Sequence, residues 1–312
     1  MGIYPLLRDE TCFFLVIDLD KENWQDDVRA VMETCRHFDL PMTVERSRSG
    51  NGGHLWFFFE EAIPANLARK LGTFLLTETM DARPGIGLDS YDRLFPHQDT
   101  LPQGGFGNLI ALPLQKSSRE RGDTVFLNDG FQPHPDQWAW LSSIHRIKRE
   151  TVQTLMTREE QRGRVLGVRL FPMDDHEVQP WLTSPSRPPA KLPPGGTMPK
   201  QVELILGNQI YLPKDLLTPS LQSHLIRMAA FQNSEFYKAQ VMRLPTYGTP
   251  RVIGCAEDFP QHIGLPRGCL EDVQALLFDL KVSVNLRDER LPGQRLEVEF
   301  QGQLHPEQEA AA

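Results

Sequence analysis

Two carboxylates lie one residue apart near the start of the chain. Asp18 and Asp20 close the run FFLVIDLD, whose aromatic and β-branched residues predict a buried strand. Side chains alternate along a strand, so both carboxylates should project from the same face. Such a pair is costly unless a cation or a base neutralises it, because like charges raise each other's pKa. The spacing suggests a metal site; the alternative is that the segment simply ends a strand, with both carboxylates solvated.

Hard carboxylate oxygens favour Mg²⁺ or Mn²⁺, and we expect two such ions. A pair of divalent ions can activate an attacking hydroxyl and stabilise a leaving pyrophosphate. Phosphoryl transfer depends chiefly on this positioning and charge neutralisation. A third carboxylate is therefore expected. Asp89, in GIGLDSYDR, is the candidate and Asp92 the second choice.

A glycine-rich segment, RSRSGNGGH, follows the acidic pair. Its glycines let backbone N–H groups approach phosphate oxygens closely, and neighbouring side chains can donate further hydrogen bonds. The segment lacks the Lys and Ser/Thr that end a P-loop and leads into a strand, which disfavours an ATPase. The alternative is an ordinary hairpin, turning at Asn51-Gly52, with a strand-edge histidine. We expect a triphosphate to be bound by Arg46, Arg48, Ser49, Gly50, Asn51, Gly52, Gly53 and His54.

The pattern of apolar residues predicts the elements that must position these groups. The order strand, helix, two strands and helix predicts an α/β fold of the α+β type, a two-layer sandwich resembling the RNA-recognition-motif fold. Its expected strands are 13–20, 41–46, 54–60 and 109–114, and its expected helices are 22–38 and 64–80.

A stretch rich in Pro and Gly divides the chain. Residues 184–200, SPSRPPAKLPPGGTMPK, contain too much of both for a regular element and predict a linker. Residues 1–183 are expected to form the catalytic domain, and residues 201–312 a smaller mixed α/β accessory region. A chain of 312 residues is long enough for two such units.

The composition excludes several classes of protein. The net charge of −8 argues against a protein that coats nucleic acid by bulk electrostatics, so any contact should be made by local patches or through bound cations. The four cysteines form no CxxC pair, so zinc-site spacing is absent and reduced, mostly buried thiols are expected. Because no apolar run approaches about 20 residues, we expect a cytoplasmic protein without a membrane segment.

The segments VIDLD, SRSGNGGH and the later Leu88-Asp89 step resemble, in this order, the three motifs of the archaeo-eukaryotic primase superfamily. The stretches YPLLRDETCFFLVIDLDK, ERSRSGNGGHLWFFFE, GLDSYDRLFPHQD and GGFGNLIALPLQ are similar to the primase-polymerase branch of bacterial TOTE conflict systems. Those proteins are relatives of CRISPR-associated primase-polymerases. The likeness covers nearly the whole chain, and the second motif is its most specific part.

The resemblance implies a DNA primase-polymerase that transfers nucleotides from a dNTP or NTP to a 3′-hydroxyl on a template-primer DNA. It implies that Asp18, Asp20 and Asp89 ligate the catalytic metals, while Ser49 and His54 contact the phosphates. The strand NLIALPLQ departs from the family's Arg and Ser pattern, so Asn108 and Gln115 are weaker candidates. A zinc knuckle commonly precedes this core and a helicase follows it. We therefore expect a fragment or a minimal version, with a helicase domain or subunit as a partner.

Two other functions fit the same residues. A metal-dependent nuclease or phosphodiesterase could use a similar carboxylate cluster but would need no triphosphate. A non-catalytic nucleotide- or DNA-binding module of a defence system would use the acidic pair structurally. Basic residues between positions 116 and 169 could contact a template backbone, although the acidic residues among them favour a solvated helical face.

Overall fold

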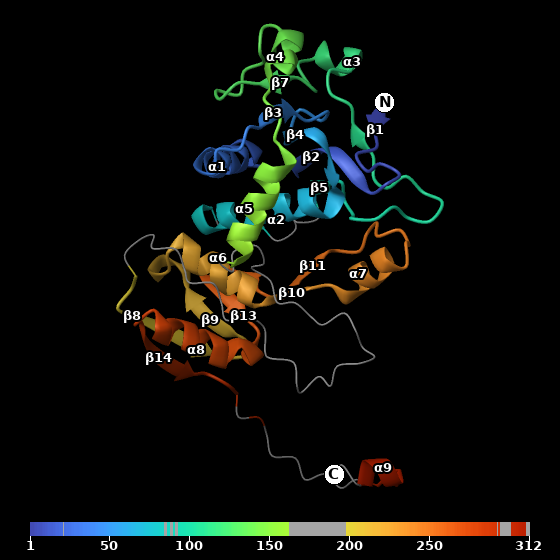
Figure 1. The fold of residues 1–312 in the computed structure, drawn as a ribbon. Helices are drawn as coiled ribbons and strands as arrows, with labels where there is room; N and C mark the ends of the chain where they lie inside the picture. Colours follow the sequence, from blue (N-terminus) through green and yellow to red (C-terminus); the bar gives the residue numbers. More distant parts are fainter. Residues whose placement is uncertain are drawn as a thin grey trace.

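In the computed structural model, the first half of the chain forms an open sheet with helices packed against it (Figure 1). The sheet has the order β5-β2-β4-β3-β7, and every neighbouring pair is antiparallel. The structure describes residues 1–20, 22–83, 86–87, 90, 93–161, 198–291, 293 and 301–309.

The order of the elements is strand, helix, two strands, helix and strand, which confirms the expected two-layer arrangement of an RNA-recognition-motif-like fold. Both major helices lie against the same face of the sheet, and the opposite face carries the acidic pair. The elements of this unit are β2 (Thr11–Leu19), α1 (Trp24–His37), β3 (Thr43–Arg46), β4 (Gly53–Pro64), α2 (Ala65–Ala82), β5 (Leu94–Phe95) and β7 (Phe126–Leu127).

Tight packing against the helices fixes which face each residue of the sheet occupies. A Cβ atom added at Gly53 would lie 2.8 Å from ring carbons of Trp24 in α1, so the Gly53 side of β4 is closed by that helix. A Cβ atom at Gly72 of α2 would lie 3.3 Å from Leu15 of β2. Since side chains alternate along a strand, Asp18 and His54 must project from the face opposite the helices.

The register then brings three polar residues into one row across the sheet. Asp18 of β2 pairs with His54 of β4, and His54 pairs with Glu45 of β3. A slip of one residue would send all three side chains to the helix-covered face. The buried residues on that face therefore hold the row in place.

The hairpin loop between β3 and β4 turns at Arg48-Ser49 and not at the expected Asn51-Gly52. The amide of Ser47 donates to the carbonyl of Gly52 at 2.8 Å, and Gly50 donates to Ser47 at 3.0 Å. The left-handed residue is Gly50, with φ of 78°, and not Asn51. The predicted turn at Asn51-Gly52 is therefore wrong, because the hydrogen bond that Gly50 donates back to Ser47 sets the turn.

The predicted strand at 109–114 is reduced to two residues. β6 (Ile110–Ala111) pairs with β1 (Gly2–Ile3) in a small separate sheet. Pro113 has no N–H to donate, and Leu114 adopts a left-handed conformation with φ of 59°. Both features end the strand. Three short helices complete this half: α3 (Lys116–Arg119), α4 (Gln137–Ser143) and α5 (Arg149–Gln161).

The second half has a sheet and an apolar core of its own, lying below the first sheet in Figure 1. Its sheet has the order β12-β13-β9-β8-β14, in which only β14 and β8 are parallel. Of the expected linker, residues 184–197 lie outside the described residues. The elements are β8 (Gln201–Leu206), β9 (Ile210–Pro213), α6 (Pro219–Met228), β10 (Ala230–Gln232), α7 (Ser234–Val241), β11 (Val252–Gly254), β12 (Glu257–Asp258), β13 (His262–Leu265), α8 (Leu270–Asp279), β14 (Ser283–Asp288) and α9 (Pro306–Glu309).

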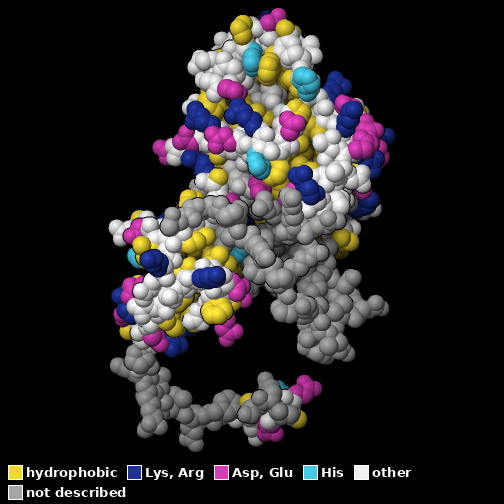
Figure 2. All heavy atoms as spheres, turned by 60° about the vertical axis from the view of Figure 1, so that its left-hand side comes forward, with side chains coloured by type: hydrophobic (Ala, Val, Ile, Leu, Met, Phe, Trp, Pro, Cys, Tyr) yellow, Lys and Arg dark blue, Asp and Glu magenta, His cyan; other side chains and the backbone are white. Residues whose placement is uncertain are grey.

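The surface carries charges of both signs. Figure 2 shows basic and acidic side chains interspersed over the face that it presents. Ion pairs account for part of this mixture: Arg29 lies 3.0 Å from Asp26, and Arg36 lies 2.8 Å from Asp129. Among the described residues, no helix combines the length and the apolar character that a membrane crossing requires.

Candidate functional site

A pocket of about 270 Å³ opens where β2 ends and β4 begins, on the face of the sheet opposite the helices. It receives side chains from the acidic pair, from the hairpin loop and from the chain around β5 and β6. Its lining consists of Asp18, Asp20, Ser47, Arg48, Ser49, His54, Phe95, Leu109, Ile110 and Ala111. Residues from the first two predicted motifs thus meet in one cavity.

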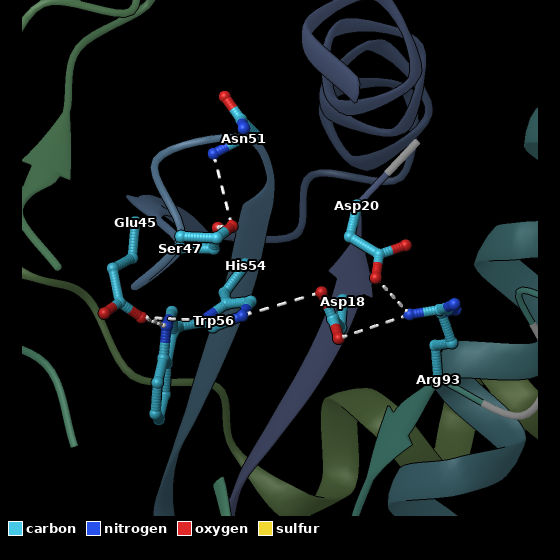
Figure 3. Close-up of polar contacts among 9 residues, drawn as sticks. Asp18, Asp20, Glu45, Ser47, Asn51, His54, Trp56 and Arg93 are labelled. Carbon is cyan, nitrogen blue, oxygen red and sulfur yellow. Dashed lines mark hydrogen bonds and ion pairs between the residues drawn. The ribbon is translucent and has the colours of Figure 1, made fainter. Parts of the chain in front are cut away.

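Both carboxylates of the acidic pair point toward Arg93 (Figure 3). Nη1 of Arg93 lies 2.5 Å from Oδ2 of Asp20 and 3.8 Å from Oδ2 of Asp18. Burial raises the pKa of Asp18; His54 and Arg93 oppose this shift, whereas the neighbouring charge of Asp20 adds to it. A cation bound beside Asp18 would oppose this shift, because a nearby positive charge stabilises the ionised carboxylate.

His54 lies between two acids. Its Nε2 atom is 3.5 Å from Oδ1 of Asp18, on the pocket side. Its Nδ1 atom is 3.0 Å from Oε2 of Glu45, which also accepts the indole N–H of Trp56 at 2.7 Å (Figure 3). Glu45 is fully buried. This carboxylate therefore sets the orientation of the imidazole ring and directs Nε2 into the pocket.

The surroundings of His54 favour its protonated form. Burial alone lowers the pKa of His54, but the hydrogen bond and the charge of Glu45, together with Asp18 and Asp20, outweigh it and raise the pKa above its ordinary value. An imidazolium presents N–H donors on both ring nitrogens. Nε2 can therefore donate to an anionic ligand in the pocket.

The hairpin loop supplies further donors to the same cavity. Arg48 and Ser49 are exposed at its rim, while Ser47 is buried. Oγ of Ser47 lies 3.0 Å from Oγ of Ser49, and the amide of Asn51 donates to Ser49 at 3.3 Å. These bonds order the loop, and the exposed guanidinium of Arg48 adds positive charge to it. Such an arrangement suits an oligophosphate.

Several expected phosphate ligands do not line the pocket. Arg46 donates to the backbone carbonyls of Gly122 and Phe131 at 3.0 and 3.2 Å, so its guanidinium braces the loop from outside. Gln115 donates to the carbonyls of Met1 and Leu112, and its Oε1 accepts from the N-terminal amine. Asn108 is half-buried and stands next to the lining residue Leu109.

The glycines of the loop and Asn51 act through the backbone. Gly50 supplies the left-handed turn. A Cβ atom at Gly52 would lie 3.1 Å from the carbonyl oxygen of Leu19 and 3.2 Å from Cα of Asp20, so a glycine here lets the loop approach the acidic pair. Gly53 fits against α1. Asn51, Gly50, Gly52 and Gly53 thus shape the loop without lining the pocket.

The third expected carboxylate, Asp89, lies outside the described residues, as does Asp92. Within the part that the structure describes, no three His, Cys, Asp or Glu side chains come together as a metal-binding group. The two carboxylates that are described do suit a hard divalent ion. Both face the same pocket, and both contact a positively charged group.

The sequence-based prediction missed Glu45, Trp56 and Arg93. Glu45 could have been predicted. In a hairpin whose first strand ends at Arg46 and whose second strand begins at Gly53, Glu45 lies opposite His54. Trp56 follows from the same alternation, two residues beyond His54. Arg93 carries no comparable signal. Its approach to Asp20 depends on the pairing of β5 with β2, which connects distant parts of the chain.

Comparison with protein families finds a match over the first half of the chain. Residues 1–155 match the family model described as "TOTE conflict system, Archaeo-Eukaryotic Primase domain". The matched range contains the acidic pair, the hairpin loop and every residue that lines the pocket. A comparison with curated protein sequences finds no significant match.

Proposed function

Because residues 1–155 belong to the archaeo-eukaryotic primase family of TOTE conflict systems, we propose that this chain is a template-directed nucleotidyltransferase. It joins the α-phosphate of a nucleoside triphosphate to a 3′-hydroxyl of a DNA primer, and the bond to pyrophosphate breaks. The observation that carries the proposal is one pocket lined by two carboxylates, Asp18 and Asp20, and by the hydrogen-bond donors Arg48, Ser49 and His54.

The acidic side of the pocket would hold the metal ions. Asp18 and Asp20, together with Asp89, would bind two Mg²⁺ or Mn²⁺ ions. When bound, these ions supply charge neutralisation at the reacting phosphate and lower the proton affinity of the attacking hydroxyl. Arg93, 2.5 Å from Asp20 and 3.8 Å from Asp18, already neutralises part of the charge of the pair.

The basic side of the pocket would hold the triphosphate. Arg48, Ser49 and His54 would donate hydrogen bonds to phosphate oxygens, and Glu45 would keep the His54 ring turned toward them. The apolar wall formed by Phe95, Leu109 and Ile110 would exclude water from one side of the bound nucleotide. These contacts position the α-phosphate for in-line attack, which provides much of the catalysis in phosphoryl transfer.

The test is extension of a labelled primer on a DNA template with Mn²⁺ or Mg²⁺. Asp18→Asn and Asp20→Asn should each abolish synthesis while leaving the far-ultraviolet spectrum unchanged. Asp129→Asn, at an exposed carboxylate paired with Arg36, is the matched control and should retain activity. Synthesis that survives the combined Asp18→Asn and Asp20→Asn substitutions would eliminate the proposal. Triphosphate-independent degradation of the primer would identify a nuclease instead, and triphosphate binding without turnover a binding module.

A further inference from the structure

A loop connects two walls of the pocket and reaches into the second half of the chain. β5 places Phe95 in one wall, and the residues around β6 place Leu109, Ile110 and Ala111 in another. Residues 96–108, here called the wall loop, join these walls. Because Phe95 and Leu109 at its two ends line the pocket, a displacement of the wall loop would move both walls.

Gln240 in α7 binds the wall loop at three points. The amide of Asp99 donates to Oε1 of Gln240 at 3.0 Å, and Nε2 of Gln240 donates to Oδ2 of Asp99 at 3.1 Å. The hydroxyl of Thr100 donates to the backbone carbonyl of Gln240, also at 3.0 Å. One glutamine therefore holds both the main chain and the side chain of the loop.

The same loop residue is tied to the helix layer of the first half. Nε of Arg69, in α2, lies 2.9 Å from Oδ1 of Asp99, and the Arg69 side chain is 2% exposed. The guanidinium carbon of Arg69 lies 5.9 Å from the ring centre of Phe236 in α7. A buried ion pair is costly to break when one partner is moved away. Asp99 thus joins α2, the wall loop and α7 in one partly buried contact.

Two more contacts hold the wall loop on either side of Asp99. The hydroxyl of Thr246 lies 3.1 Å from Oε1 of Gln98, and the amide of Gln103 donates to the carbonyl of Arg243 at 2.7 Å. Nη1 of Arg243 also lies 2.6 Å from Oε1 of Glu10, next to the start of β2. The segment 240–246 therefore contacts the loop along its length.

The segment that leads into the wall loop, Arg93 and β5, is connected directly to the acidic pair. Leu94, at the start of β5, pairs with Ile17 of β2. The amide of Asp18 donates to the carbonyl of Arg93 at 3.0 Å. A displacement of the loop would therefore shift both Phe95 in the pocket wall and Arg93 beside the carboxylates.

We propose that Gln240 is a positioning residue for the nucleotide pocket, so that the segment 240–246 of the second half completes the catalytic unit instead of serving as a separate accessory. The identity of the bound ligand, a nucleoside triphosphate, rests on the proposed function. The hydrogen bonds that link Gln240 to the wall loop go to Asp99 and Thr100, and it acts through these two residues. Its loss should widen the pocket and weaken triphosphate binding more than it slows the chemical step.

The experiment compares Gln240→Ala with Gln222→Ala in the full chain. Gln222 lies in α6 and donates only to Lys214 and Leu217 of its own half, so it is a matched control. Hydrogen exchange should become faster in peptides covering residues 94–111 for Gln240→Ala, and remain at the wild-type rate for Gln222→Ala. The KM for the triphosphate should rise about 10-fold for Gln240→Ala, with a smaller change in kcat. Thr100→Val, which removes one bond of the clamp, should shift both measurements in the same direction by less.

Unchanged exchange in residues 94–111, or an unchanged KM beside faster exchange, would overturn the inference. A fall in kcat at constant KM would overturn it as well. Should the wild-type chain make no product, the proposed function fails instead. The inference is then tested by hydrogen exchange in residues 94–111 and by calorimetric titration with a Mn²⁺-triphosphate. In the titration, Gln240→Ala must still bind the triphosphate about 10-fold more weakly than Gln222→Ala.

Discussion

Nδ1 of His54 lies 3.0 Å from Oε2 of Glu45, an oxygen that also accepts the indole N–H of Trp56 at 2.7 Å. The Glu45 side chain is fully buried, whereas the other nitrogen of His54 faces Asp18 at 3.5 Å. Oε2 of Glu45 thus contacts both Nδ1 of His54 and the indole N–H of Trp56, and these contacts fix the orientation of the imidazole ring. The histidine of the second motif is presented to the pocket in one orientation by a residue of the neighbouring strand.

Replacing Glu45 should therefore impair the reaction although Glu45 never reaches the pocket. Glu45→Gln keeps the shape but removes the charge, and a hydrogen bond to a charged group contributes about 1.5–3 kcal/mol. We expect kcat/KM in primer extension to fall about 10- to 100-fold. Glu203→Gln, at a partly exposed carboxylate paired with Arg287, is the control. A Glu45→Gln enzyme with wild-type kcat/KM would show that the row across the sheet is only structural.

The two arginines of the hairpin loop should behave differently. Arg48 lines the pocket, whereas Arg46 donates to the carbonyls of Gly122 and Phe131. Arg48→Ala should raise the KM for the triphosphate about 10-fold or more, the equivalent of one charge-assisted hydrogen bond, without lowering the thermal midpoint. Arg46→Ala should lower the thermal midpoint and change the KM less. Calorimetry measures the thermal midpoint of both variants, and steady-state kinetics measures their KM. A larger rise in KM for Arg46→Ala than for Arg48→Ala would contradict the roles assigned to the two arginines.

Most of the first half could be predicted from the sequence because its elements follow strong local patterns. The run FFLVIDLD and the helical spacing in α1 and α2 each identify one element without knowledge of the rest. The edge strand β5 and its pairing with β2 were not predicted, because they depend on tertiary contacts and not on a local pattern. The strand expected at 109–114 was overestimated, because a left-handed residue at Leu114 and the missing N–H of Pro113 end it after two paired residues.

The site could be predicted only where the sequence motif and the pocket coincide. Asp18, Asp20 and His54 are adjacent in space because alternation and register bring them together. Arg46 was predicted to bind phosphate, but its guanidinium donates to the backbone carbonyls of Gly122 and Phe131 instead. The residue type alone does not reveal these bonds. Arg93 could not be predicted, because its contact with Asp20 requires the tertiary pairing of β5 with β2.

Gly53 should be required for packing between β4 and α1. A Cβ atom there would lie 2.8 Å from Trp24 and 2.9 Å from Cγ2 of Val28, so either the helix or the strand must move. Overpacking of this kind costs about 1–3 kcal/mol. Gly53→Ala should lower the unfolding free energy by that amount in urea titration. Gly105→Ala, whose Cβ would meet Pro102 at an ordinary 3.5 Å, is the control. Equal stability of the two variants would contradict the packing argument.

The stability of the second half should decrease at acid pH because of His224 in α6. Burial, assisted by the charge of Arg227, lowers the pKa of His224 to about 4. An unfolded histidine has a pKa of about 6.5, so the unfolded state binds more protons as the pH falls below that value. The contribution of neutral His224 is present above pH 6.5 and is lost progressively toward pH 4, by about 3 kcal/mol at most. Thermal midpoints between pH 8 and pH 4.5 measure this loss. His224→Gln should flatten the dependence, while the exposed His37→Gln should leave it as in the wild type; equal slopes for His224→Gln and the wild type would rule out His224 as the cause.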